Sequence, residues 1–224
     1  MQGLSEQRGR ISCAERLTLV VISRGHPVLL RRAVQYHASL VDRLMVVDTS
    51  AQPARWVDPS QVYYYHDPEL ASASDQALHA FAVQHVHTPF VAFIKADDFL
   101  VADALEQCVD FLEANLDYGY CHGYGLGYLA SGVGIRYCLR QRKGPEDHAQ
   151  QEPAQRLLGQ ARHFVPMLDA VMRTELLCRW HEQAPVLDGE LLAVGQALFF
   201  LSQAKARVLP VAYGVRALNY PEAE

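Results

Sequence analysis

Runs of consecutive apolar residues recur along the first half of the chain and predict buried strands. The run LTLVVIS, residues 17–23, is continuous and rich in β-branched residues, which is typical of a strand covered on both faces. Three later segments are also expected to be strands, at residues 43–48, 61–66 and 89–95. We therefore expect four short strands in this half of the chain.

Apolar residues at helical spacing separate these strands. A helix is expected to begin at Pro27, because proline suits a first helical position. Its apolar stripe is formed by Leu30, Ala33, Val34 and His37. A second helix is expected over about 72–85, and a third after the fourth strand, with Cys108 on its inner face. This alternation predicts an α/β fold with a mostly parallel central sheet flanked by helices.

The second half of the chain has a different pattern. Residues 118–140 alternate aromatic residues with glycine and predict a hairpin or meander. The polar stretch 141–155 contains two prolines and predicts a loop. Two helices are expected next, at 173–180 and 188–206, before a closing strand at 207–216.

Composition narrows the class of protein. With 224 residues, half of them apolar, the chain can bury a substantial core in one domain or at most two small ones. The net charge of −5 provides no basic field, so a role in binding nucleic acid is not expected. Five cysteines without a C-x-x-C pair argue for reduced thiols and against a structural zinc site.

Hydropathy bears on location. No apolar run approaches the roughly 20 residues that span a bilayer, and the N-terminus lacks the apolar segment of a signal peptide. We therefore expect a cytoplasmic protein without a transmembrane segment. A peripheral membrane contact is left open.

Polar residues follow several predicted strands at their carboxyl ends. Ser23 and Asp48 end two of them, and the adjacent pair Asp97 and Asp98 follows the fourth. In parallel sheets these ends share one edge, where ligands bind. The pair could cap the next helix, although one aspartate suffices for a cap and Asp103 could also serve. Alternatively, the carboxylates could hold a hard divalent cation.

Several segments resemble one enzyme family. LTLVVISRGHPVLLRRAV, LMVVDTS and TPFVAFIKADDFLVADALEQCVDFLEAN resemble the N-terminal half of a GT-A fold glycosyltransferase of the family-two type. The nearest likeness is to a small bacterial subgroup with a (T/S)R-x-x-P first loop and an ADDDF-like metal motif. HFVPMLDAVMRTELL and VLPVAYGVRALNY resemble its acceptor side, so the likeness runs from Leu17 to Tyr220.

The resemblance implies a division of the chain. A flexible N-terminus, 1–16, would precede a single GT-A-like domain, 17–220. Within that domain, residues 17–117 would form the nucleotide-binding half and residues 118–220 the acceptor-side half.

The resemblance also implies how a nucleotide-sugar donor binds. Ser23 and Arg24 would flank the base and ribose, and Asp48 would hydrogen-bond one of them. Asp97 and Asp98 would form the metal motif for Mg²⁺ or Mn²⁺. Asp98 would be the direct ligand, and Asp97 would lie nearer the ribose or a metal-bound water.

The metal motif of this chain departs from that of the family. Ala96 stands where a third aspartate is common, and Lys95 replaces a small or apolar residue. One carboxylate fewer and one ammonium more should weaken the affinity for a cation. Either Lys95 points away from the crevice, or it neutralises phosphate in partial place of the metal.

An inverting transfer needs a base that takes the proton of the acceptor hydroxyl. The resemblance places this carboxylate at the start of a late helix, where Glu190 is the first choice and Asp188 the second. Asp188 equally suits the N-cap of that helix. On the acceptor side, His163 is a candidate contact to sugar and Arg216 a candidate partner of phosphate.

The sequence thus predicts a metal-assisted, inverting glycosyltransferase of bacterial polysaccharide or glycoconjugate synthesis. Its donor would be a nucleotide-diphosphate sugar, and its acceptor a hydroxyl of a saccharide or glycoconjugate. Two alternatives stay open: a nucleotide-sugar-binding module that has lost turnover, and a nucleotidyltransferase on a related scaffold. Homo-oligomerisation is left open as well.

Overall fold

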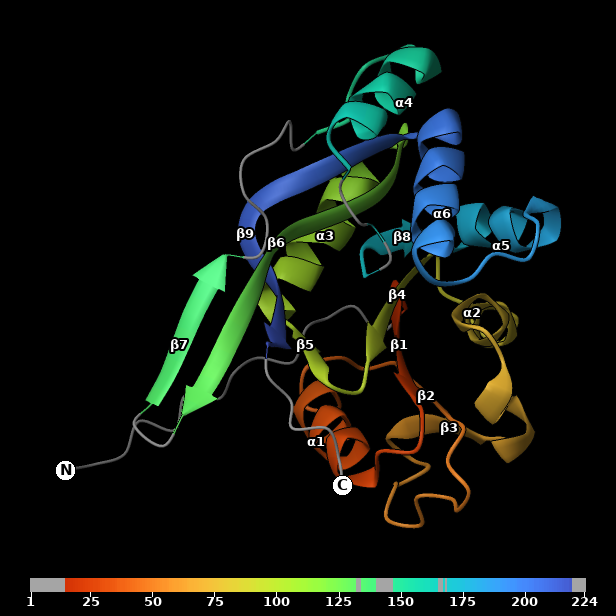
Figure 1. Ribbon diagram of the computed structural model, residues 1–224, viewed down its shortest axis with the longest axis vertical. Helices are drawn as coiled ribbons and strands as arrows, with labels where there is room; N and C mark the ends of the chain where they lie inside the picture. The colour runs from red at the N-terminus through yellow and green to blue at the C-terminus, as the bar shows by residue number, and fades with distance from the viewer. Residues whose placement is uncertain (1–14, 132–133, 140–146, 165–166, 168, 219–224) are drawn as a thin grey trace.

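The described residues form one mixed sheet with helices on both faces (Figure 1). A computed structural model describes residues 15–131, 134–139, 147–164, 167 and 169–218 of the chain. Across these residues the sheet has nine strands in the order β3-β2-β1-β4-β8-β6-β9-β5, with β7 paired to β6. The N-terminal strands are β1 (Leu17–Ser23), β2 (Leu44–Asp48), β3 (Val62–His66) and β4 (Phe90–Lys95). The others are β5 (Asp98–Leu100), β6 (Tyr118–Ser131), β7 (Gly134–Leu139), β8 (Val171–Arg173) and β9 (Lys205–Ala217).

The first four strands run parallel, as the sequence predicted. β1 lies between β2 and β4, and β2 pairs with β3 at the edge of the sheet. Their carboxyl ends therefore lie along one edge of the sheet, which is at the bottom of Figure 1. We call this the carboxyl edge.

The remaining strands make the other half of the sheet mixed. β6 pairs antiparallel with β7 and β8 and parallel with β9, so the expected hairpin is confirmed for the described part of 118–140. β5 pairs antiparallel with the C-terminal part of β9. The sequence did not predict β5, because three residues are too few to show a periodicity.

Helices cover both faces of this sheet. α1 and α3 pack on one face, and α2, α5 and α6 on the other (Figure 1). The helices are α1 (Pro27–His37), α2 (Asp75–Val83), α3 (Ala102–Ala114), α4 (Pro153–Arg162), α5 (Thr174–Gln183) and α6 (Gly189–Gln203). The expected helix at 72–85 is shorter, because a 3-10 helix, η1 (Pro68–Ser72), precedes α2. The expected loop 141–155 also ends earlier than predicted, because α4 begins at Pro153.

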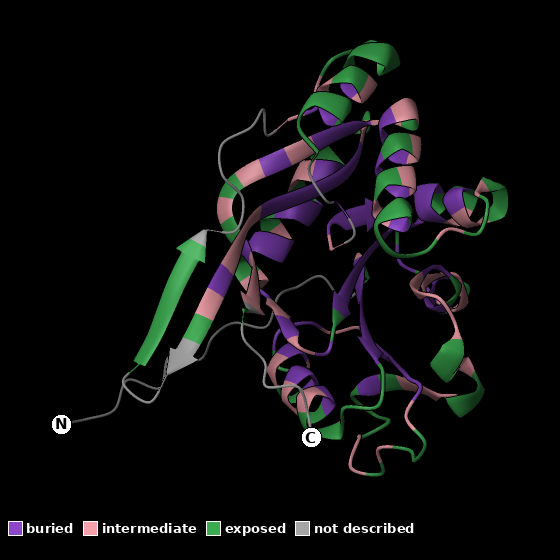
Figure 2. Ribbon diagram, viewed as in Figure 1, coloured by how far each residue is buried: buried purple, intermediate pink, exposed green. Residues whose placement is uncertain are grey.

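Alternating side chains of β1 join the two layers. Leu19 and Val21 pack with α1 and α3, whereas Val20 and Ile22 pack with the helices of the other face. The whole of β1 is buried, which explains its unbroken apolar run (Figure 2). Among the described residues, no helix is long and apolar enough to cross a membrane.

Candidate active site

The parallel strands bring three of the predicted site residues to the carboxyl edge. Ser23 at the end of β1 lies opposite Asp48 at the end of β2. On the other side of β1, Ile22 lies opposite Lys95 at the end of β4. The structure therefore gathers Ser23, Asp48 and Lys95 along one edge, as expected from the parallel sheet.

The hydroxyl of Ser23 has an unusual environment. Ser23 is buried, and its Oγ has no hydrogen-bond partner among the described residues. Its carbonyl oxygen, by contrast, accepts hydrogen bonds from the backbone N–H and the Oγ1 hydroxyl of Thr49. Buried polar groups are almost always paired, so an orphan hydroxyl at this edge is suited to a ligand.

Asp48 is held in place by neighbours on both carboxylate oxygens. Oδ1 accepts the N–H of Ser50 at 3.0 Å, and Oδ2 accepts the hydroxyl of Tyr64 at 2.6 Å. The same hydroxyl accepts the N–H of Ala54 at 2.7 Å. Burial and the hydrogen bond to Asp48 raise the pKa of Tyr64 to about 12, so the phenol stays protonated. Asp48 therefore keeps a fixed orientation, with further lone pairs on each oxygen.

Arg24 and Lys95 both approach the carboxylate of Asp75, in the first turn of α2. Arg24 Nη2 donates to Asp75 Oδ1 at 2.7 Å and to the carbonyl of Ala73 at 2.8 Å. Lys95 Nζ lies 3.6 Å from Asp75 Oδ2. Burial alone would raise the pKa of Asp75, but the Arg24 hydrogen bond and the nearby cations outweigh it and lower that pKa. Asp75 therefore remains ionised and anchors both cations.

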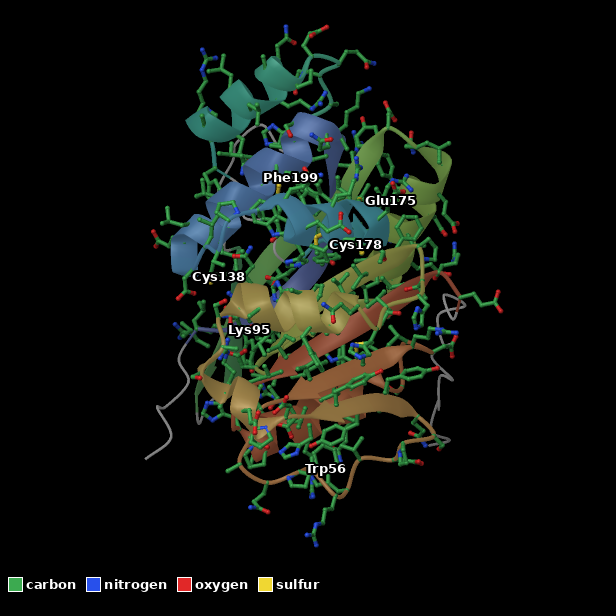
Figure 3. The ribbon with its side chains drawn as sticks, turned by 90° about the vertical axis from the view of Figure 1, so that its right-hand side faces the viewer. Trp56, Lys95, Cys138, Glu175, Cys178 and Phe199 are labelled. Carbon is green, nitrogen blue, oxygen red and sulfur yellow. The ribbon has the colours of Figure 1, made fainter. Side chains whose placement is uncertain are left out.

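The conformation of the first loop allows this arrangement. Gly25, which follows Arg24, has φ of 79°, in the left-handed region that favours glycine. Lys95 remains 62% exposed and lies beside α2, below the first turn of α6 in Figure 3. The side chain of Arg24 is also partly exposed. Both cations are thus positioned at the carboxyl edge and accessible to a charged ligand.

Asp98 is paired with Arg216. The two residues lie opposite each other in the β5–β9 ladder. Arg216 Nε donates to Asp98 Oδ1 at 2.7 Å and to Oδ2 at 2.6 Å, and Nη2 also donates to Oδ2. The hydrogen bond to Asp98 is the main reason that the pKa of Arg216 is raised. The structure thus brings together two predicted site residues that lie far apart in sequence.

Asp97 and Asp98 do not cap α3. That helix begins at Ala102, and its N-cap residue Val101 makes no side-chain cap hydrogen bond. Asp97 is half-buried, and its carbonyl oxygen accepts Arg32 Nη2 at 3.1 Å. The capping interpretation of this acidic pair is therefore wrong.

A divalent cation does not fit Asp98 as the described residues stand. Both carboxylate oxygens of Asp98 accept from the guanidinium of Arg216, so a divalent cation would have to share them with this positive charge. Ala96 adds no carboxylate. Within the described ranges there is no group of three histidine, cysteine or acidic residues that could hold a metal ion. The assignment of Asp97 and Asp98 as metal ligands stays a prediction from the resemblance.

The start of α6 is tied to the start of α2. Gln76 Nε2 donates to the carbonyl of Pro185 at 3.0 Å, and Gln76 Oε1 accepts the N–H of Leu187 at 2.6 Å. Gln76 follows Asp75, the anchor of Arg24 and Lys95. These bonds therefore bring the beginning of α6 to the same side of the molecule as the two cations.

The two base candidates differ in their local contacts. Asp188 is the N-cap of α6, and its Oδ1 accepts the N–H of Gly189 at 2.8 Å. Glu190 is exposed in the first turn and makes no side-chain hydrogen bond to a described residue. Of the two carboxylates, Glu190 is therefore the one that does not cap α6 and can accept a proton from a substrate.

His163 lies apart from the predicted site residues at the carboxyl edge. It is exposed and directly follows α4, which lies at the top of Figure 1, away from the carboxyl edge. α4 is attached to the C-terminal end of α6, because Arg156 Nε donates to the carbonyl of Leu201 at 2.8 Å. No contact among the described residues joins His163 to the other candidates.

Sequence reasoning missed two residues of this site. Tyr64 belongs to a strand of three consecutive tyrosines, and nothing in the sequence shows which of them reaches Asp48. Asp75 follows Ser74, which caps α2, so its sequence signal is that of an ordinary helix start.

Solved structures show the same fold, although no protein-family model and no curated protein matches the sequence. S. aureus TarS 1–349 in complex with UDP-GlcNAc matches with a TM-score of 0.63 and 16% identity, covering 92% of this chain and 60% of that one. The complex of TarS 1–349 with UDP gives a TM-score of 0.62 at 16% identity, with coverage of 91% and 60%. This chain thus spans about 60% of the length of those chains. The match and the α/β sheet show that it has the fold of a GT-A glycosyltransferase.

Proposed function

We propose that this protein is a glycosyltransferase that moves a sugar from a nucleotide diphosphate to a hydroxyl acceptor. The observation that carries the proposal is the orphan hydroxyl of Ser23 beside the oriented carboxylate of Asp48, at the carboxyl edge of a GT-A fold. The matched TarS structures are complexes with UDP-GlcNAc and UDP, which supports a uridine diphosphate sugar as the first donor to test.

On the donor side, polar and cationic groups have separate roles. Ser23 and Asp48 would bind the ribose or base, because both offer hydrogen-bonding capacity at the end of adjacent strands. Arg24 and Lys95 would face the diphosphate, since Asp75 fixes them without removing them from solvent. Positive charge there stabilises the leaving group as the glycosidic bond breaks.

On the acceptor side, we assign the base to Glu190. The acceptor hydroxyl oxygen attacks the anomeric carbon, and its proton passes to the Glu190 carboxylate. The bond from the anomeric carbon to the diphosphate oxygen breaks, and its electron pair leaves with the diphosphate. Attack from the face opposite the leaving group inverts the anomeric configuration. Asp188 supports this base by capping α6.

A second candidate function keeps donor binding and loses transfer. Two observations favour it: Asp98, the expected metal ligand, is paired with Arg216, and Ala96 stands where a third aspartate is common. Such a protein would bind a nucleotide sugar and release no product.

Calorimetry and turnover together test the proposal. The purified protein would be titrated with UDP, GDP, ADP and dTDP, each with Mn²⁺ and with EDTA. We expect binding of at least one nucleotide diphosphate, weakened about tenfold by Asp48→Asn, the size of one lost hydrogen bond to a charged group. Absence of binding across the whole panel would contradict the proposal. The exposed Asp58→Asn is the matched control and should bind as the wild type does.

Turnover separates the two candidate functions. Release of nucleotide diphosphate from the matching nucleotide sugar supports transfer chemistry. Binding without any release, unchanged by Glu190→Gln, would instead assign the chain to the binding modules.

A further inference from the structure

Arg216 carries a positive charge at the position where a metal ion was expected. Its side chain is 32% exposed, whereas that of Asp98 is only 7% exposed. The pair therefore lies at the boundary between the protein interior and the solvent. The carboxylate is on the inner side, and the guanidinium is the accessible part.

The backbone fixes this pair firmly. β5 and β9 are paired through Asp98 with Arg216 and through Leu100 with Gly214. The ladder is extended by the N–H of Val101, which donates to the carbonyl of Tyr213 at 2.8 Å. The backbone that carries Arg216 is thus fixed in the sheet, opposite the backbone of Asp98.

A second carboxylate lies near the same guanidinium. Asp169 Oδ2 is 3.5 Å from Arg216 Nη2. The hydroxyl of Tyr213 donates to the carbonyl oxygen of Asp169 at 2.6 Å, so β9 holds this residue too. The guanidinium of Arg216 therefore offsets the negative charge of two carboxylates, which would otherwise repel a nucleotide diphosphate.

The way in which Arg216 pairs leaves part of its fork available. Nε and Nη2 face Asp98, while Nη1 makes no hydrogen bond to a described residue. The two N–H groups of Nη1 can still donate hydrogen bonds to a phosphate. A divalent ion beside Asp98 would instead have to displace this guanidinium or sit against its positive charge.

We propose that the guanidinium of Arg216, held by Asp98, faces the diphosphate of the donor and replaces a divalent cation there. The inference rests on the proposed function, because it concerns the charge that the same site offers to its nucleotide. It accounts for Ala96 and for Lys95, since a site with its own fixed cation needs no third carboxylate and tolerates an additional ammonium.

The first experiment compares nucleotide binding with and without metal. UDP, or whichever nucleotide diphosphate binds in the panel, is titrated into the full chain in EDTA and in Mn²⁺. We expect the two dissociation constants to agree within about threefold. Loss of one charge-assisted hydrogen bond would produce a larger difference. Binding that requires Mn²⁺ would overturn this inference and leave the glycosyltransferase proposal standing. Absence of binding in both conditions would contradict both.

The second experiment removes the cation. Arg216→Gln should weaken binding in EDTA by at least about tenfold, and Mn²⁺ should restore much of it, because the carboxylate of Asp98 then no longer faces a guanidinium and can accept a metal ion in its place. Equal binding by wild type and Arg216→Gln in EDTA would overturn the inference. Arg207→Gln is the control, since Arg207 is also on β9 and also paired, with Asp147, but lies at the other end of the strand.

A double variant covers the case in which Arg216→Gln removes the guanidinium that offsets the buried charge of Asp98 and the protein does not fold. Arg216→Gln with Asp98→Asn removes both charges and keeps similar shapes. We expect it to fold, to bind nucleotide weakly in EDTA and to gain nothing from Mn²⁺. Binding as tight as that of the wild type in EDTA would contradict the role of Arg216.

Discussion

The hydroxyl of Tyr64 donates to the buried carboxylate of Asp48 at 2.6 Å while it accepts the N–H of Ala54. This single phenol connects the end of β2 to the loop that follows it. The orientation of Asp48 toward a ligand at the carboxyl edge therefore depends on a residue from the next strand.

Removing that phenol should affect both stability and binding. Tyr64→Phe leaves one lone pair of Asp48 and the N–H of Ala54 without this partner, which should cost about 1–2 kcal/mol in the free energy of unfolding. Nucleotide binding should weaken several-fold, because Asp48 loses its fixed orientation. Urea denaturation and calorimetry measure the two effects. Tyr63→Phe, at the exposed neighbouring tyrosine, should change neither. Equal behaviour of both variants would contradict this role.

Removing the hydroxyl of Ser23 should weaken nucleotide binding without lowering stability, unlike Tyr64→Phe, which should lower both. Its hydroxyl is buried without a described partner, so Ser23→Ala removes a polar group whose burial is unfavourable. We expect the free energy of unfolding to stay the same or to rise by up to about 1 kcal/mol. The affinity for nucleotide should fall at the same time.

Thermal unfolding with and without nucleotide would measure both effects for Ser23→Ala. Ser39→Ala, which removes an exposed hydroxyl, is the control. A variant of Ser23 that is clearly destabilised and binds nucleotide normally would show that the hydroxyl has a structural role only.

Glu190 can be tested against a carboxylate in an equivalent position. Glu190→Gln should lower kcat on the order of 10²-fold or more, the usual effect of removing a general base, and leave the affinity for the donor nearly unchanged. Glu175 is exposed in the first turn of α5 (Figure 3), which is the position that Glu190 has in α6. Glu175→Gln should therefore keep full activity in a nucleotide-release assay. If Glu190→Gln also keeps it, the base is elsewhere.

His37 predicts how the stability of the fold depends on pH. Burial lowers the pKa of His37 from 6.5 to about 4, although its hydrogen bond to Ala33 acts in the opposite direction. Nδ1 donates to the carbonyl of Ala33, and Nε2 accepts the N–H of Leu100 in β5, so the folded state needs the neutral ring. The unfolded chain takes up a proton near pH 6.5 and the folded chain only near pH 4.

Stability from His37 is therefore present above pH 6.5 and is lost as the pH falls toward 4. The expected slope is about 1.4 kcal/mol per pH unit in this window. Urea denaturation at several pH values would show it, and His37→Gln should flatten the slope by that amount. A variant with the slope of the wild type would contradict the prediction. His163→Gln, at an exposed histidine, is the control.

Much of the first half of the fold was predictable from local pattern. β1, β2 and β4 are buried apolar runs, and their ends at Ser23, Asp48 and Lys95 had to share an edge once the strands were parallel. The start of α1 was equally clear, since Pro27 occupies its first turn. These features depend on a few consecutive residues, which periodicity and turn chemistry describe well.

The partners of the site residues depended on tertiary structure. Arg216 meets Asp98 because β9 pairs with β5 in a particular register, and no local signal fixes a register between segments 118 residues apart. Asp75 meets Arg24 because α2 starts beside the first loop. The sequence could thus predict which edge carries the site, but not which charges neutralise one another there.

A crystal structure of the protein with UDP, or with the nucleotide diphosphate that binds in its place, tests the central claim most directly. The account predicts density for the nucleoside against Ser23 and Asp48, and for the diphosphate against Lys95 and Arg216. A nucleotide bound away from the carboxyl edge, or an edge that stays closed at concentrations where binding is measured, would contradict it.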